Sequence, residues 1–140
     1  MAANCLVDTG ALVALLDQHD SWHAVCREAV RELPLPLVTS TAVLTELFHL
    51  LRPTRRELEA AWSLLRSGAI ALVPVLHEEL ADIHALMAQY WDRPMDFADA
   101  TLVHLARRES IYTIFTVDHS DFATYRIGKR KFRIVPDPRW

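Results

Sequence analysis

The chain has 140 residues, of which 51% are hydrophobic and 24% are charged, proportions typical of a globular domain. A chain of this length buries roughly 68% of the surface that its unfolded form exposes, so its core needs no disulfide or metal. Fifteen basic and 18 acidic side chains give a net charge of −3. This charge excludes a protein surface that is cationic throughout and coats nucleic acid, but it allows a local basic patch. None of the three glycines belongs to a Walker or Rossmann pattern, which disfavours common nucleotide-binding loops.

The composition also indicates a cellular compartment. Cys5 and Cys26 are too few for a disulfide framework, which favours a reducing interior. No positively charged leader precedes Asp8, so we expect no signal peptide. The longest apolar stretch, residues 69–76, contains Pro74 and is far shorter than the ~20 residues that span a bilayer. We therefore expect a cytoplasmic protein that makes no use of a membrane.

In chain order, short apolar runs alternate with segments of helical spacing. The expected strands cover residues 5–7, 37–39, 70–73, 112–116 and, as an edge strand, 132–135. The expected helices cover residues 11–16, 22–33, 41–52, 55–67, 77–91 and 97–106. Neither an internal repeat nor a linker-like stretch is present, so we expect one domain over residues 1–140. Such alternation predicts an α/β fold with helices around a mostly parallel sheet, whose ligands bind at the carboxyl ends of the strands.

Four acidic residues lie where such a site would form. Asp8 and Asp118 directly follow apolar strands, although either residue alone is also typical of a helix cap or a turn. Glu46 lies inside a helix beside its apolar stripe, where an unpaired carboxylate is unfavourable. Asp99 lies in the first turn of a helix that Asp96 is expected to cap, and its carboxylate is free to point into the cleft.

Four carboxylates brought together from separate segments would repel one another at neutral pH. The sequence places no lysine or arginine beside them to offset this charge. Divalent cations remove the repulsion, and ligands that are all oxygen favour Mg²⁺ or Mn²⁺ over zinc. Such a site is typical of metal-assisted phosphodiester hydrolysis.

Four segments in chain order resemble the acidic motifs of PIN domains. They are LVDTGALVALL at 6–16, STAVLTEL at 40–47, MDFADATL at 95–102 and IFTVDHSDF at 114–122. Each motif alone is weak, but the ordered set is specific and spans nearly the whole chain. The resemblance implies an α/β/α sandwich with a central five-stranded, mostly parallel sheet.

The same resemblance implies a ribonuclease that depends on Mg²⁺ or Mn²⁺ and leaves a 5′-phosphate on its product. By position, it assigns the catalytic and metal-binding acids to Asp8, Glu46, Asp99 and Asp118. Asp96 and Asp121 are further acids that lie beside these motifs. Short PIN chains of one domain are most often VapC-type toxins, which implies an RNA substrate, an antitoxin partner and a homodimer.

The segment from Arg126 to Arg133 is the clearest anomaly of charge, because five of its eight residues are basic. It follows Asp118 by a few residues, so we expect it near the same end of the sheet, with Lys129, Arg130 and Lys131 as candidate contacts to RNA phosphates. Two other interpretations stay open. Cations commonly protect an edge strand from pairing with other chains, and the run is equally suited to contact an antitoxin.

Two functions other than a toxin ribonuclease fit the pattern. The chain is alternatively a non-catalytic PIN-like α/β binding module, or an RNA-processing nuclease without an antitoxin. An inactive PIN scaffold is expected to have lost acids, whereas all four are present. A phosphate-accepting receiver domain is disfavoured because only one acid follows the first strand, and a D-x-D phosphatase is excluded by Gly10.

Overall fold

The computed structural model describes residues 4–93 and 95–137, so the remaining residues of the expected 1–140 domain lie outside the described part. Five strands form one sheet in the order β3-β2-β1-β4-β7, and every neighbouring pair is parallel. These strands are β1 (Cys5–Val7), β2 (Leu37–Thr39), β3 (Ile70–Leu72), β4 (Thr113–Phe115) and β7 (Arg133–Val135). The expectation of a five-stranded, mostly parallel sheet within an α/β fold is confirmed.

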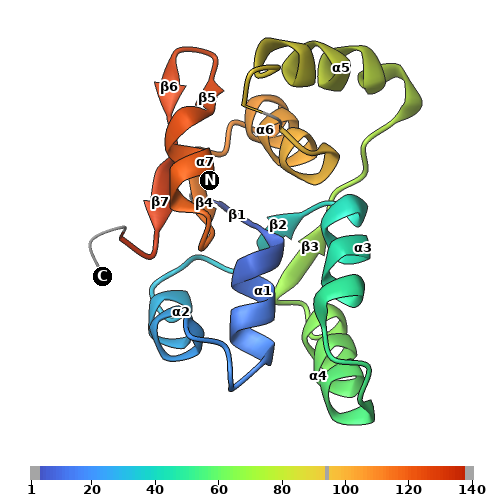
Figure 1. Ribbon diagram of the computed structural model, residues 1–140, viewed down its shortest axis with the longest axis vertical. Coiled ribbons are helices and arrows are strands. Elements are labelled where there is room, and N and C mark those ends of the chain that lie inside the picture. Colours follow the sequence, from blue (N-terminus) through green and yellow to red (C-terminus); the bar gives the residue numbers. More distant parts are fainter. Residues whose placement is uncertain (1–3, 94, 138–140) are drawn as a thin grey trace.

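Helices cover the sheet from both sides. The helices are α1 (Thr9–Leu16), α2 (His23–Val30), α3 (Thr41–Leu50), α4 (Arg55–Arg66), α5 (Leu80–Gln89), α6 (Phe97–Glu109) and α7 (His119–Thr124), with a 3₁₀ turn, η1 (His77–Glu79). In Figure 1, α5 and α6 lie above the sheet, and α1, α2 and α4 lie below it. Side-chain oxygens of Ser40, Thr54 and Asp96 accept backbone N–H groups and begin α3, α4 and α6.

Three elements differ from those expected. The helix expected at 77–91 is η1 followed by α5, and Glu79 holds its start by accepting the N–H of Leu76 at 2.7 Å. The chain after β4 forms α7, which is too short for its sequence to show a helical period. A hairpin of β5 (Arg126–Ile127) and β6 (Arg130–Lys131) follows, and it turns at Gly128 with a φ of 63°.

The core is continuous around β1 and α6. Leu6, Ile114 and Phe115 are fully buried, and α6 is buried from Ala98 to Ala106, which explains its weak amphipathic pattern. Elements that pack on this core hold the loops at the carboxyl edge of the sheet in place. Over residues 4–93 and 95–137, no helix reaches both the length and the apolar character needed to cross a membrane.

Candidate functional site

The parallel pairing of β1 with β4 brings two acidic loops to one edge of the sheet. The N–H of Asp8 donates to the carbonyl of Phe115 at 3.0 Å, so both strands end side by side. Gly10 allows the loop before Asp118 to approach α1, because a Cβ at position 10 would lie 2.6 Å from a methyl carbon of Val117. The close approach of Asp8 to the second loop therefore depends on a glycine.

Asp8 is buried and both of its oxygens accept hydrogen bonds. Oδ1 accepts the N–H of Thr9 at 2.8 Å, and Oδ2 accepts the hydroxyl of Thr116 at 3.0 Å. The same hydroxyl oxygen accepts the N–H of Asp118 at 2.9 Å, so Thr116 links the two acids. Burial raises the pKa of Asp8 to about 6, and the charges of Glu46 and Asp118 act in the same direction against these hydrogen bonds.

Glu46 reaches this edge from α3. Its Oε1 accepts the hydroxyl of Thr9 at 2.7 Å, and the side chain is half-buried. A carboxylate beside the apolar stripe of α3 thus has the polar partner that its position requires. Thr9 therefore connects Asp8, through the backbone N–H, with Glu46, through the hydroxyl.

Asp99 is buried at the N-terminal end of α6. It is 8% exposed, and its Oδ2 accepts the hydroxyl of Tyr125 at 3.2 Å. Burial, followed by the charges of Asp8 and Asp96, raises the pKa of Asp99 to about 8. Asp96 caps α6 as expected, with its Oδ1 accepting the N–H of Asp99 at 2.7 Å.

Asp118 caps α7, and its Oδ1 accepts the N–H of Asp121 at 3.3 Å. One carboxylate oxygen from each of Asp99, Asp118 and Asp121 lies within 4.8 Å of the other two. Burial and the neighbouring Asp121 raise the pKa of Asp118. We refer to these acids as the carboxylate cluster, whose members are Asp8, Glu46, Asp99, Asp118 and Asp121.

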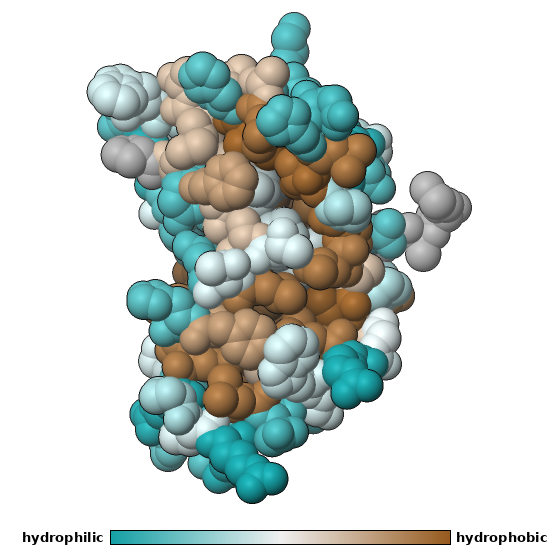
Figure 2. Space-filling model, turned by 90° about the vertical axis from the view of Figure 1, so that its right-hand side faces the viewer, coloured by the Kyte–Doolittle hydropathy of each residue, from teal (hydrophilic) through white to brown (hydrophobic). Residues whose placement is uncertain are grey.

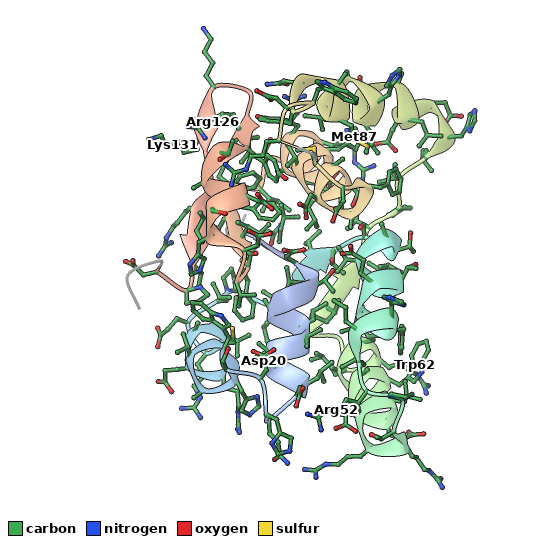
Figure 3. The ribbon with its side chains drawn as sticks, in the orientation of Figure 1. Asp20, Arg52, Trp62, Met87, Arg126 and Lys131 are labelled. Atoms are coloured by element: carbon green, nitrogen blue, oxygen red, sulfur yellow. The ribbon has the colours of Figure 1, made fainter. Side chains whose placement is uncertain are left out.

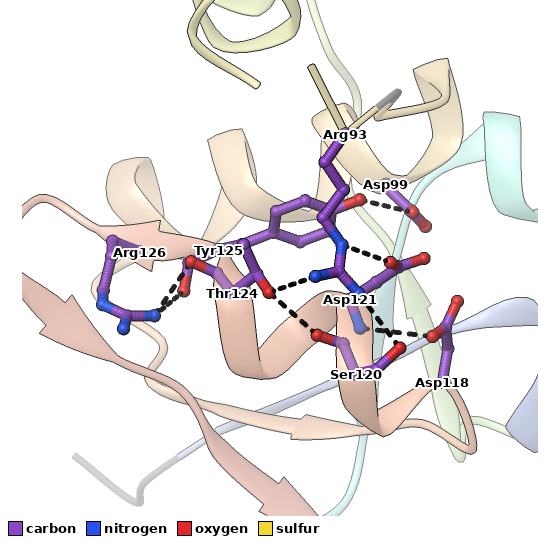
Figure 4. Close-up of polar contacts among 8 residues, drawn as sticks. All are labelled: Arg93, Asp99, Asp118, Ser120, Asp121, Thr124, Tyr125 and Arg126. Carbon is purple, nitrogen blue, oxygen red and sulfur yellow. Dashed lines mark hydrogen bonds and ion pairs between the residues drawn. The ribbon is translucent and has the colours of Figure 1, made fainter. Parts of the chain in front are cut away.

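The expectation that no cation lies beside these acids is wrong. Arg93, in the loop before α6, reaches α7 and places its Nε 3.0 Å from Asp121 Oδ1 (Figure 4). The two terminal nitrogens of its guanidinium donate to Thr124 Oγ1 at 2.9 Å and to Ser120 Oγ at 3.1 Å. Arg93 and Tyr125 are the site residues that the sequence does not reveal, because both meet their acids only through the fold.

The expected position of the basic segment from Arg126 to Arg133, called the basic run, is also wrong. Arg133 pairs with Thr113, the first residue of β4, so the preceding hairpin lies at the amino edge of the sheet. There the guanidinium of Arg130 stacks on Tyr112, 3.6 Å from the ring centroid. The physical reason is α7, which carries the chain from the carboxyl edge back toward the start of β7.

Members of the basic run also differ in their roles. Arg126 donates to the carbonyls of Ala123, Thr124 and Tyr125 and so binds the C-terminal end of α7. Figure 3 shows it on the hairpin together with Lys131. Lys129, Arg130 and Lys131 are exposed. Contact between these three residues and RNA stays a prediction. Any such contact would involve nucleotides that lie away from the carboxyl edge of the sheet.

The carboxylate cluster has the chemistry of a site for a hard divalent cation. Its donors are carboxylate oxygens, three of them close enough to share one ion, and burial makes their unneutralised charge unfavourable. Burial raises the pKa values of Asp8 and Asp99, so positive charge supplied at this site would favour the deprotonated form of each acid.

The fold is that of a PIN domain. The PIN domain family matches residues 5–127, and the chain belongs to that family. Ribonuclease VapC26 of Mycobacterium tuberculosis (strain ATCC 25618 / H37Rv) is 33% identical over 135 residues, which cover 94% of this chain and 99% of that relative. The resemblance to VapC proteins is thereby confirmed.

Solved structures show the same relationship. The crystal structure of Mycobacterium tuberculosis VapC20, a sarcin-ricin loop cleaving toxin, superposes with a TM-score of 0.75 at 25% identity and covers 89% of this chain and 98% of its own. The structure of FitAB bound to an IR36 DNA fragment has a TM-score of 0.65 at 16% identity, with 93% and 94% of the two chains covered. The latter similarity concerns the fold alone.

Proposed function

We propose that this chain is an endoribonuclease that depends on Mg²⁺ or Mn²⁺ and acts as the toxin of a VapBC-like toxin–antitoxin pair. The main observation behind this proposal is that carboxylate oxygens of Asp99, Asp118 and Asp121 lie within 4.8 Å of one another, near the buried Asp8. Membership of the PIN family and the similarity to VapC26 and VapC20 support nuclease activity on RNA.

Four acids would hold the cation: Asp8, Glu46, Asp99 and Asp118. Asp121, the third acid of the close group, is paired with Arg93 and is not counted among these ligands. When bound, Mg²⁺ or Mn²⁺ supplies Lewis acidity, which activates water and offsets the charge that develops at the leaving oxygen. The protein contributes the orientation of these ligands. Thr116 holds Asp8 and the backbone of Asp118, Thr9 holds Glu46, and Tyr125 holds Asp99.

Asp118→Asn tests the proposal, with Asp82→Asn as the control because Asp82 is an exposed acid on α5. We expect wild type to cleave a mixture of structured and single-stranded RNAs in Mg²⁺ or Mn²⁺, and to stop when EDTA is added. Asp118→Asn is expected to reduce cleavage at least about 100-fold by removing one metal ligand, and Asp82→Asn to leave it unchanged. Cleavage that persists in Asp118→Asn would reject the assignment, and RNA binding without cleavage in either metal would favour a non-catalytic module.

A protein partner is the second part of the proposal. Exposed apolar side chains gather on the face formed by α3, α4 and α5, shown in Figure 2. They include Leu58, Trp62, Leu72, Leu76 and Leu80. Such a surface is typical of contact with another protein, and we propose a homodimer and an antitoxin as its partners. Light scattering of the chain alone, and together with the product of a short adjacent gene, measures both; a monomer in both samples would reject them.

A further inference from the structure

One cation lies within the carboxylate cluster at a position that the proposed function does not use. Arg93 pairs with Asp121, and in the part of the chain that the structure describes this is the only ion pair of the cluster. The Arg93 side chain is 42% exposed, so its guanidinium is accessible to a ligand. Its partner Asp121 has a carboxylate oxygen within 4.8 Å of oxygens of Asp99 and Asp118.

The guanidinium of Arg93 is held in place by the protein but keeps N–H groups that are free to bind an anion. Bonds to Asp121, Thr124 and Ser120 use three of its five N–H groups. These contacts fix its orientation on one face of α7, as Figure 4 shows. An anion that binds there meets a group whose conformational entropy has already been lost on folding, which favours affinity.

An RNA strand that enters the cluster needs such a group. The acids repel its phosphates, and a bound cation offsets that repulsion only at the phosphate it touches. Lys129, Arg130 and Lys131 are at the amino edge of the sheet, away from phosphates at the carboxyl edge. The planar fork of an arginine matches two oxygens of one phosphate.

We propose that Arg93 binds the RNA phosphate next to the scissile one. The inference rests on the proposed function and adds to it a residue that contacts the substrate. It also separates two roles on the same helix: Arg93 contacts side chains along one face of α7, whereas Arg126 binds the backbone carbonyls at its C-terminal end.

The test measures RNA binding and metal binding separately. In an Asp8→Asn protein, which is not expected to cleave, binding of a fluorescein-labelled 20-nucleotide RNA is followed by anisotropy in Mg²⁺ at several salt concentrations. Adding Arg93→Gln is expected to weaken binding about tenfold, as for one charge-assisted contact, and to make the slope of log K against log salt shallower by about 0.7. Arg93→Lys keeps the charge and is expected to retain the slope with intermediate affinity.

Arg126→Gln is the matched control, because it removes an arginine that binds backbone carbonyls of α7 and, within the described residues, makes no hydrogen bond or ion pair with the carboxylate cluster. We expect it to leave RNA affinity within about twofold, and Arg93→Gln in the wild-type background to leave the Mn²⁺ dissociation constant within the same range. Three results overturn the proposal: an unchanged RNA affinity and slope in Arg93→Gln, an equal loss in Arg126→Gln, or an equal loss of Mn²⁺ affinity.

The two proposals fail in different ways. If the Asp8→Asn protein binds RNA in a manner that depends on Arg93 but wild type never cleaves, the nuclease is rejected and the phosphate contact stands. If wild type cleaves and Arg93→Gln binds RNA normally, the phosphate contact alone is rejected. Absence of any RNA binding by the Asp8→Asn protein overturns the phosphate contact, whereas cleavage by wild type alone decides the nuclease.

Discussion

The two edges of the same sheet carry opposite charge, which is buried at one edge and exposed to solvent at the other. At the carboxyl edge, Asp8 and Asp99 are buried and are held by hydroxyl groups. At the amino edge, Lys129 and Lys131 are exposed on a hairpin, and Figure 3 labels Lys131 there. Because the strands separate these edges, the basic residues do not neutralise the acids. The charge of the carboxyl edge must be balanced there, by protonation, by Arg93 or by a metal ion.

Neutralising one buried acid is expected to have the largest effect. Asp99→Asn should reduce RNA cleavage at least about 100-fold, because a metal ligand is lost. It should also leave the metal-free protein as stable as wild type or stabilise it by ~1 kcal/mol, since the folded state no longer has to protonate residue 99 or bury its charge. Cleavage rates and urea unfolding measure both effects. A variant that unfolds more easily and still cleaves would show that Asp99 has only a structural role.

The second prediction concerns pH. The pKa values of Asp8 and Asp99 are raised to about 6 and about 8, above the values near 4 of unfolded aspartates, so the folded state binds more protons between pH 4 and pH 8. The contribution of these groups to the stability of the metal-free protein should therefore be highest below pH 4. It should fall by a few kcal/mol as pH rises to 8. Saturating Mn²⁺ should remove most of this decrease, because it stabilises the deprotonated acids in the folded state.

Urea unfolding at several pH values, with and without Mn²⁺, measures that decrease. Asp99→Asn is the control and should have a shallower dependence above pH 6, where only wild type still loses a proton from residue 99. A wild-type stability that is flat from pH 5 to pH 8 without metal would contradict the burial of charge at this edge.

Tyr125→Phe should have a smaller effect. Its hydroxyl bond lowers the pKa of Asp99 against the effect of burial, so its loss should raise that pKa further. We expect a decrease in cleavage of about fivefold at pH 7 and a shift of the acidic limb of the pH–rate profile to higher pH, with stability changed by ~1 kcal/mol. Phe122→Leu, a change in the adjoining core, should lower stability without shifting the profile. An unshifted profile in Tyr125→Phe would exclude the hydroxyl from tuning Asp99.

The smallest effect is expected at the amino edge. Substituting Lys129, Arg130 and Lys131 with alanine should weaken RNA binding at low salt by about threefold or less and slightly flatten its salt dependence, because any contact involves phosphates away from the cluster. Turnover of bound RNA should not change. A loss of affinity larger than that of Arg93→Gln would show that RNA follows the amino edge after all. Unchanged affinity and slope would favour a role in protecting an edge or in contacting an antitoxin.

Much of the architecture could be predicted because it depends on local patterns. Apolar runs marked all five strands of the sheet, and Ser40, Thr54 and Asp96 marked helix starts through their own side chains. The six residues of α7 and the two-residue strands of the hairpin were not anticipated, because neither is long enough to show a period. That omission led to the wrong placement of the basic run.

The sequence by itself determined the α/β class, the parallel sheet and the segments that carry Asp8, Glu46, Asp99 and Asp118, because apolar periodicity and motif order are properties of neighbours in the chain. Only the tertiary structure decided which groups meet these acids. Tyr125 lies 26 residues from Asp99 and Arg93 lies 28 from Asp121, so their contacts depend on how α6 and α7 pack. The edge at which the hairpin lies depends on strand register, which hydrogen bonds between distant segments set.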